Sequence, residues 1–221
     1  RNLMLNYAIG SRATPGSIFK MVTGFGALDS GVLKPDEMIS DMGYYTAYNS
    51  DLSTAPKCWI SEGYRSQHYY QTIVGGLEHS CNYFFYECGS RLGETRLYQY
   101  AAAFGLTSKT GIDLPGEART IFHAKGSLGT TELATASFGQ RFKVSPISQL
   151  TAICAVANGG YLVTPHLLDR FVDDDGVTIK EYGTAVKRQV VSTETARTLT
   201  QILEAGVSGD GGAKNAYVKG Y

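Results

Sequence analysis

The sequence places Pro15-Gly16-Ser17-Ile18-Phe19-Lys20 at what we predict is the start of a helix. Proline and glycine suit a sharp entry into a helix. The residues that follow have the apolar spacing of a buried helix face: Met21, Val22, Phe25 and Leu28. Positions three apart share a helix face, so Ser17 and Lys20 should point the same way. A serine hydroxyl needs a nearby base to become a nucleophile, and a lysine with a lowered pKa can be that base.

A lone Ser-x-x-Lys pattern is weak, because average residue usage gives roughly one match by chance in a chain of 221 residues. A second motif, Ser80-Cys81-Asn82, strengthens it. This motif precedes the aromatic run 83–86 and is typical of the start of another helix. Ser80 also suits the N-cap of that helix, which is the structural alternative to a catalytic role.

Further motifs follow in a fixed order along the chain. They are Phe104-Gly105-Leu106, Thr110-Gly111-Ile112-Asp113-Leu114-Pro115-Gly116-Glu117, Ser137-Phe138-Gly139-Gln140 and Val144-Ser145-Pro146. With the first two motifs, this set resembles the transpeptidase domain of the penicillin-binding proteins, and most of all their class B (monofunctional) branch. The resemblance covers nearly the whole chain, so we expect one domain over residues 1–221. We also expect a Gram-positive source of the clostridial kind.

The resemblance implies an α+β fold of the serine β-lactamase/transpeptidase type, with an antiparallel sheet flanked by helices. A mostly helical subdomain would carry the Ser-x-Asn element. The order of the predicted elements agrees, because helices come first and strands gather late in the chain. We predict helices over residues 17–30, 80–92, 95–104, 131–138, 146–158 and 192–205, and strands over 161–168 and 187–191.

The resemblance also implies a function and a role for each motif residue. Ser17 would be the nucleophile that is acylated by a D-Ala-D-Ala stem peptide or by a β-lactam, and Lys20 would take its proton. Ser80 would relay a proton towards the leaving amine, and Asn82 would bind Lys20 and the substrate amide. The Ser17 N–H would form half of the oxyanion hole. No cofactor is required for this catalysis. The two alternatives are a serine β-lactamase and a non-enzymatic β-lactam sensor or cell-wall scaffold.

The sequence departs from the family pattern in two places. The family's Lys-Thr-Gly strand motif is not found where it is due, and Lys109-Thr110-Gly111 lies too early in the chain to be that motif. The glycine-rich stretch 208–214 looks like the approach to it, so we expect a fragment that ends before the motif and is inactive alone. Arg141 stands where relatives usually carry a second glycine after Phe-Gly-Gln, which puts the shape of that loop in doubt.

Composition indicates a globular enzyme domain, with 43% apolar and 18% charged residues. The formal net charge is zero, so no basic surplus favours nucleic acid as a partner. The family resemblance implies work at the extracytoplasmic face of the cell membrane, with an N-terminal anchor that this chain lacks. The implied partners are peptidoglycan stem peptides, β-lactams and a membrane glycosyltransferase.

The four cysteines include a candidate metal site. In many Gram-positive relatives a Cys-Trp, a His and a Ser-Cys-Asn recur in this order, and Cys58-Trp59, His68 and Cys81 match them. Two thiols and an imidazole suggest a structural, tetrahedral zinc site. The fourth ligand is open, and the candidates are Cys88, Asp51 and Glu62. A Cys58–Cys81 disulfide and reduced, inert thiols are the alternatives.

Overall fold

The computed structural model describes residues 4–64, 66–124, 126–208 and 212–219. The glycine-rich stretch 208–214, predicted to approach a further strand, lies partly outside them. The helical elements are α1 (Tyr7–Gly10), the 3₁₀ turn η1 (Gly16–Phe19), α2 (Lys20–Asp29), α3 (Trp59–Tyr64), α4 (Ile73–Glu78), α5 (Asn82–Ala103), α6 (Thr130–Ala136), α7 (Pro146–Ala157), α8 (Thr193–Ser208) and the 3₁₀ turn η2 (Lys214–Ala216). The strands are β1 (Ile39–Asp41), β2 (Tyr69–Gln71), β3 (Tyr161–Thr164), β4 (Arg170–Val172), β5 (Thr178–Glu181) and β6 (Ala185–Gln189).

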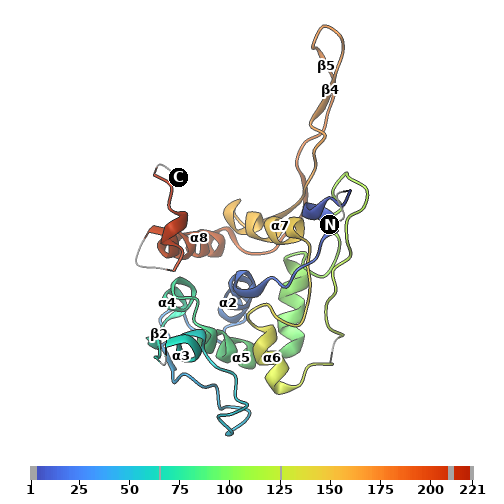
Figure 1. Cartoon of the computed structure of the whole chain (residues 1–221). Helices are drawn as coiled ribbons and strands as arrows, with labels where there is room; N and C mark the ends of the chain where they lie inside the picture. Colours follow the sequence, from blue (N-terminus) through green and yellow to red (C-terminus); the bar gives the residue numbers. More distant parts are fainter. Residues whose placement is uncertain (1–3, 65, 125, 209–211, 220–221) are drawn as a thin grey trace.

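Helix α2 lies at the centre of the molecule. It packs against α5 and α4, while α7 and α8 pack on each other and α8 also contacts α4 (Figure 1). Residues 20–27 of α2 are all buried, as expected for a helix surrounded by other elements. Aromatic side chains fill the space around it, with edge-to-face contacts such as Phe25 with Phe104 at 5.5 Å between ring centroids. The element predicted to carry Ser17 and Lys20 is therefore anchored in the core.

The strand pairs among the described residues are all antiparallel, which confirms the predicted α+β class. They form three separate pairs, β1 with β2, β3 with β6 and β4 with β5. The predicted strand 161–168 ends at Thr164, and the predicted strand 187–191 begins earlier, as β6. The β4–β5 hairpin projects far from the body, and its acidic turn is closed by hydrogen bonds from Asp173 N–H to Val177 O and from Gly176 N–H to Asp173 O (Figure 1).

The predicted helices are present, and their bounds differ by a few residues. We predicted two helices over 80–92 and 95–104, and α5 is broken between them at Gly93, whose φ of 72° and ψ of 163° are not helical. Glycine takes a positive φ without the clash that a side chain would cause. The helix that begins with η1 ends near Ser30, and Gly31 follows with a φ of 71°. This end confirms the predicted C-terminal glycine.

The loop after α6 packs on the turn that carries Ser17. Gly16 N–H donates to Gly139 O at 3.2 Å, and a Cβ on Gly139 would lie 2.2 Å from Gly16 O. Two residues on, Arg141 has a φ of 71°, in the left-handed region that favours glycine. A glycine would adopt this conformation without strain, in keeping with the expected glycine at the position of Arg141. Arg141 is held there by contacts with Thr135 and Glu132.

Gly139→Ala should destabilise the protein more than Gly116→Ala. Both glycines have a φ of +89°, but an added Cβ has nothing within 4 Å at Gly116. The left-handed backbone costs each alanine roughly 1–2 kcal/mol. The collision with the Gly16 backbone should add at least about 2 kcal/mol for Gly139→Ala. Denaturant unfolding of both variants measures the difference, and equal losses would contradict the close packing.

Candidate active site and metal centre

Ser17 and Lys20 stand at the junction of η1 and α2. Lys20 N–H donates to Ser17 O, the i to i+3 bond of a 3₁₀ turn. Residues three apart eclipse in such a turn, so this backbone agrees with the prediction that the two side chains point the same way. Ser17 is exposed, whereas Lys20 is only 1% exposed. The site thus combines an accessible hydroxyl with a buried amine.

The Lys20 amine is held by the turn between α4 and α5. Lys20 Nζ donates to Ser80 O at 2.7 Å, to Ser80 Oγ at 2.9 Å and to Asn82 Oδ1 at 2.6 Å. The Phe85 and Phe138 rings lie 5.6 and 5.9 Å from Nζ, within range of a cation–π contact. The structure therefore brings Lys20, Ser80 and Asn82 together from segments 60 and 62 residues apart.

The pKa of Lys20 is lowered from 10.5 to about 8, and burial is the main cause. Burial disfavours the charged form of an amine because it removes water from it. The nearby Cys81 and Cys58 oppose this effect and raise the pKa of Lys20. A substantial fraction of the amine is therefore neutral near pH 8, the form that accepts a proton.

The turn before α5 differs from the prediction at its cap. Cys81, not Ser80, is the N-cap, and its sulfur accepts the N–H of Phe84 at 3.4 Å. Ser80 precedes the cap with a φ of 51°, an uncommon conformation for a residue with a side chain. The structural alternative for Ser80 is therefore wrong, and its hydroxyl contacts Lys20 instead.

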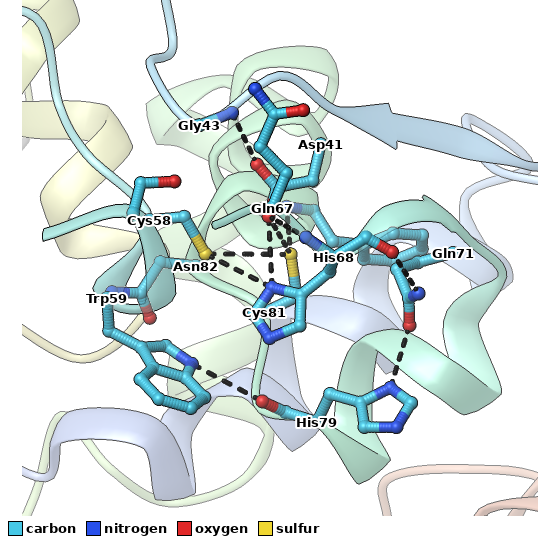
Figure 2. A network of polar contacts seen from close by, with 12 residues as sticks. Asp41, Gly43, Cys58, Trp59, Gln67, His68, Gln71, His79, Cys81 and Asn82 are labelled. Atoms are coloured by element: carbon cyan, nitrogen blue, oxygen red, sulfur yellow. Dashed lines mark hydrogen bonds and ion pairs between the residues drawn. The ribbon is translucent and has the colours of Figure 1, made fainter. Parts of the chain in front are cut away.

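Four side chains converge beside this turn: Asp41, Cys58, His68 and Cys81 (Figure 2). Their ligand atoms all lie within 4.8 Å of one another, and Asp41, Cys58 and Cys81 are fully buried. Cys58 Sγ is 3.4 Å from His68 Nδ1 and 3.9 Å from Cys81 Sγ. Asp41 Oδ2 is 3.0 Å from His68 Nδ1 and 3.4 Å from Cys81 Sγ. We call this group the Cys₂HisAsp cluster.

The charges in the Cys₂HisAsp cluster are strongly coupled. The contact with the Cys81 thiol, helped by His68, lowers the pKa of Cys58 to about 5 against the effect of burial. The same contact and burial raise the pKa of Cys81 well above its usual range. Burial would lower the pKa of His68, but hydrogen bonds to Asp41 and Cys58 raise it to about 9. Burial would raise the pKa of Asp41, but hydrogen bonds from His68 and Gly43 lower it to about 2.

The sequence identified three members of the Cys₂HisAsp cluster and missed the fourth. Cys88 is buried in the hydrophobic core and is not in the cluster, because it lies about two turns along α5 from Cys81. Asp51 and Glu62 are also outside it, and Asp41 takes their place. Asp41 reaches the cluster through strand pairing, because β1 pairs Asp41 with Tyr69, next to His68. That pairing has no short-range sequence signature.

Comparison with known proteins places the chain in a family. The family model "Penicillin binding protein transpeptidase domain" matches residues 1–221. The chain belongs to this family of penicillin-binding protein transpeptidase domains. Among the residues that the structure describes, no helix is both long and apolar enough to cross a membrane.

Named relatives extend the comparison. The chain is 37% identical over 219 residues to stage V sporulation protein D of Bacillus subtilis, covering 98% of this chain and 32% of that protein. It is 28% identical over 174 residues to peptidoglycan D,D-transpeptidase MrdA of Acinetobacter baumannii, covering 75% of this chain and 25% of that protein. The chain thus spans about a third or less of the length of these curated relatives. They give no support to a clostridial source.

A solved structure shares the fold. Penicillin binding protein 3 from Mycobacterium tuberculosis, in complex with aztreonam, superposes with a TM-score of 0.81 and 26% identity, over 96% of this chain and 47% of that one. The α+β fold of the transpeptidase type, predicted from the motif order, is confirmed.

Proposed function

We propose that the chain is the acylating part of a peptidoglycan D,D-transpeptidase, which cross-links stem peptides through an acyl-enzyme on Ser17. The observation that carries the proposal is the buried Lys20 amine, held by Ser80 and Asn82 with its pKa lowered to about 8, in the same turn as the exposed Ser17. The relative MrdA of Acinetobacter baumannii is named a peptidoglycan D,D-transpeptidase. The same serine reacts with β-lactams.

The proposed chemistry follows from the contacts. Neutral Lys20 takes the Ser17 proton while Ser17 Oγ bonds to the carbonyl carbon of the penultimate D-Ala. The C–N bond to the terminal D-Ala then breaks, and Ser80 Oγ passes the proton from Lys20 to the leaving amine. The acceptor amine of a second stem peptide attacks the ester, returns its proton to Ser17 and forms the cross-link. Asn82 holds Lys20 and the substrate amide, and the Ser17 N–H, in the first turn of η1, donates to the oxyanion.

The hydrogen bonds of the Glu117 carboxylate argue against a β-lactamase. Such an enzyme needs a positioned base to remove the acyl group with water. Glu117 is buried, and its carboxylate accepts the N–H groups of Thr110 and Gly111 and the Thr110 hydroxyl. It therefore braces the Thr110–Glu117 loop. The sequence offers no glutamate-plus-asparagine loop between Asn82 and Phe138 for this role.

The Cys₂HisAsp cluster fits a structural zinc ion. Bond lengths of about 2.0–2.3 Å in a tetrahedral site put ligand atoms about 3.3–3.8 Å apart. Four of the six separations are 3.0–3.9 Å, close to this range, and all six are within 4.8 Å. Zinc here would join β1 and the loop of Cys58 to the start of α5, and it takes no part in the reaction. A Cys58–Cys81 disulfide is the alternative.

The wider setting of the protein belongs to the same proposal. The fold holds β-lactams in a solved relative, and the family takes part in cell-wall synthesis. We propose that the protein works at the extracytoplasmic face of the cell membrane, anchored there, with a membrane glycosyltransferase as its partner.

A fluorescent penicillin tests the reaction in the full-length protein as the cell makes it. Stable labelling should be lost in Ser17→Ala and slowed at least about 100-fold in Lys20→Met, whereas Ser127→Ala, an exposed serine elsewhere, keeps it. The labelling rate should rise with pH through about 8, because the neutral form of Lys20 is the base.

The same assay separates the alternatives. Rapid loss of the label would favour a β-lactamase. Stable labelling without release of D-Ala from a stem pentapeptide would favour a sensor. Absence of labelling in the wild type would contradict every acylation mechanism.

Zinc content and thiol counting test the Cys₂HisAsp cluster. The reduced protein should bind one zinc per chain, and Asp41→Asn should weaken binding at least about tenfold, because an amide is a poorer ligand than a carboxylate. Cys88→Ser is the matched control and should keep the zinc. Absence of zinc with two thiols missing would favour the disulfide, and absence of zinc with four free thiols would favour inert cysteines.

A further inference from the structure

Trp59 connects the Cys₂HisAsp cluster to the turn that holds Lys20. It follows Cys58 directly and begins α3. Its indole N–H donates to Ser80 O at 3.0 Å and to His79 O at 3.3 Å, and Figure 2 shows the bond to His79. Its ring lies 5.4 Å from the His68 ring, centroid to centroid. One side chain therefore contacts both the cluster and the turn.

The Ser80 carbonyl is the point that Trp59 and Lys20 share. Lys20 Nζ donates to the same oxygen at 2.7 Å. A carbonyl oxygen has two lone pairs and accepts both donors. The two bonds reach this oxygen from different elements, α3 and the start of α2, and together they fix the direction of the peptide group.

The turn needs such support, because Ser80 has a φ of 51°. Left-handed backbone costs a residue with a side chain roughly 1–2 kcal/mol, and it persists only where surrounding contacts hold it. The indole bond holds the carbonyl of this strained residue. The carbonyl and hydroxyl of Ser80 are two of the three acceptors of Lys20.

We infer that Trp59 is a positioning residue for the acylation step: its indole N–H fixes the Ser80 carbonyl, which in turn fixes the Lys20 amine, three residues along the turn from Ser17. The inference rests on the proposed function. It also links the Cys₂HisAsp cluster to the active site, because Trp59 follows Cys58 in the chain and its ring contacts His68.

Trp59→Phe tests this inference in the full-length protein. Phenylalanine keeps an aromatic ring against His68 and removes the indole N–H together with the second ring, so the melting temperature and zinc content report any loss of packing. The second-order rate constant for acylation by fluorescent penicillin should fall about tenfold, in keeping with a hydrogen bond of about 1.4 kcal/mol, and the pH midpoint of the rate should shift. Zinc content and melting temperature should stay near wild type. Tyr161→Phe, at an aromatic of similar exposure on β3, should leave rate and midpoint unchanged.

The remaining outcomes distinguish a failure of the role of Trp59 from a failure of the proposed function. An unchanged rate and pH midpoint in Trp59→Phe, or an equal fall in Tyr161→Phe, would overturn the inference. A wild type that penicillin does not acylate would refute the proposed function instead. Trp59 is the sole tryptophan of these 221 residues, and its emission, taken as the difference between spectra with and without Trp59→Phe, gives a second test. Lys20→Met should shift the emission maximum, and an unshifted maximum would overturn the link through Ser80.

Discussion

The burial of one lysine constrains the whole arrangement. Lys20 enters the core as the first residue of α2, where an unpaired ammonium would cost several kcal/mol. Ser80 and Asn82 supply the three oxygen acceptors that offset this cost. The turn between α4 and α5 must therefore close on the start of α2. The same contact that allows the charge to be buried also assembles the candidate catalytic groups.

The Cys₂HisAsp cluster supports that turn from the other side. Cys81 belongs to the cluster and is also the N-cap of α5. It stands between the catalytic candidates Ser80 and Asn82, and both sets of contacts hold its backbone in place. Asp41 arrives on β1 and His68 just before β2, and the pairing of these strands brings them together. A loop with little regular structure is thus tied to the site through four short side chains and through Trp59.

Local signals in the sequence predicted much of this fold and site. Helix-start patterns, a glycine at a helix end and the order of the motifs located the four candidates Ser17, Lys20, Ser80 and Asn82. Each of these patterns is defined by neighbours within a few residues. Asp41 was missed, since its partners are 17 to 40 positions away and meet it through strand pairing. By residue type Ser80 suits the cap of α5 better than Cys81, and this was the structural alternative for Ser80, but Cys81 is the cap. Tertiary contact with Lys20 overrode that preference.

The ionisation of Lys20 tests the central claim most directly. NMR of the isotope-labelled lysine side chains, with Lys20→Met to assign the signal, follows the amine as pH rises. The account predicts that Lys20 loses its proton near pH 8, well below ordinary lysines, because burial lowers its pKa. Titration of Lys20 together with the other lysines, above pH 10, would contradict a buried amine held between Ser80 and Asn82.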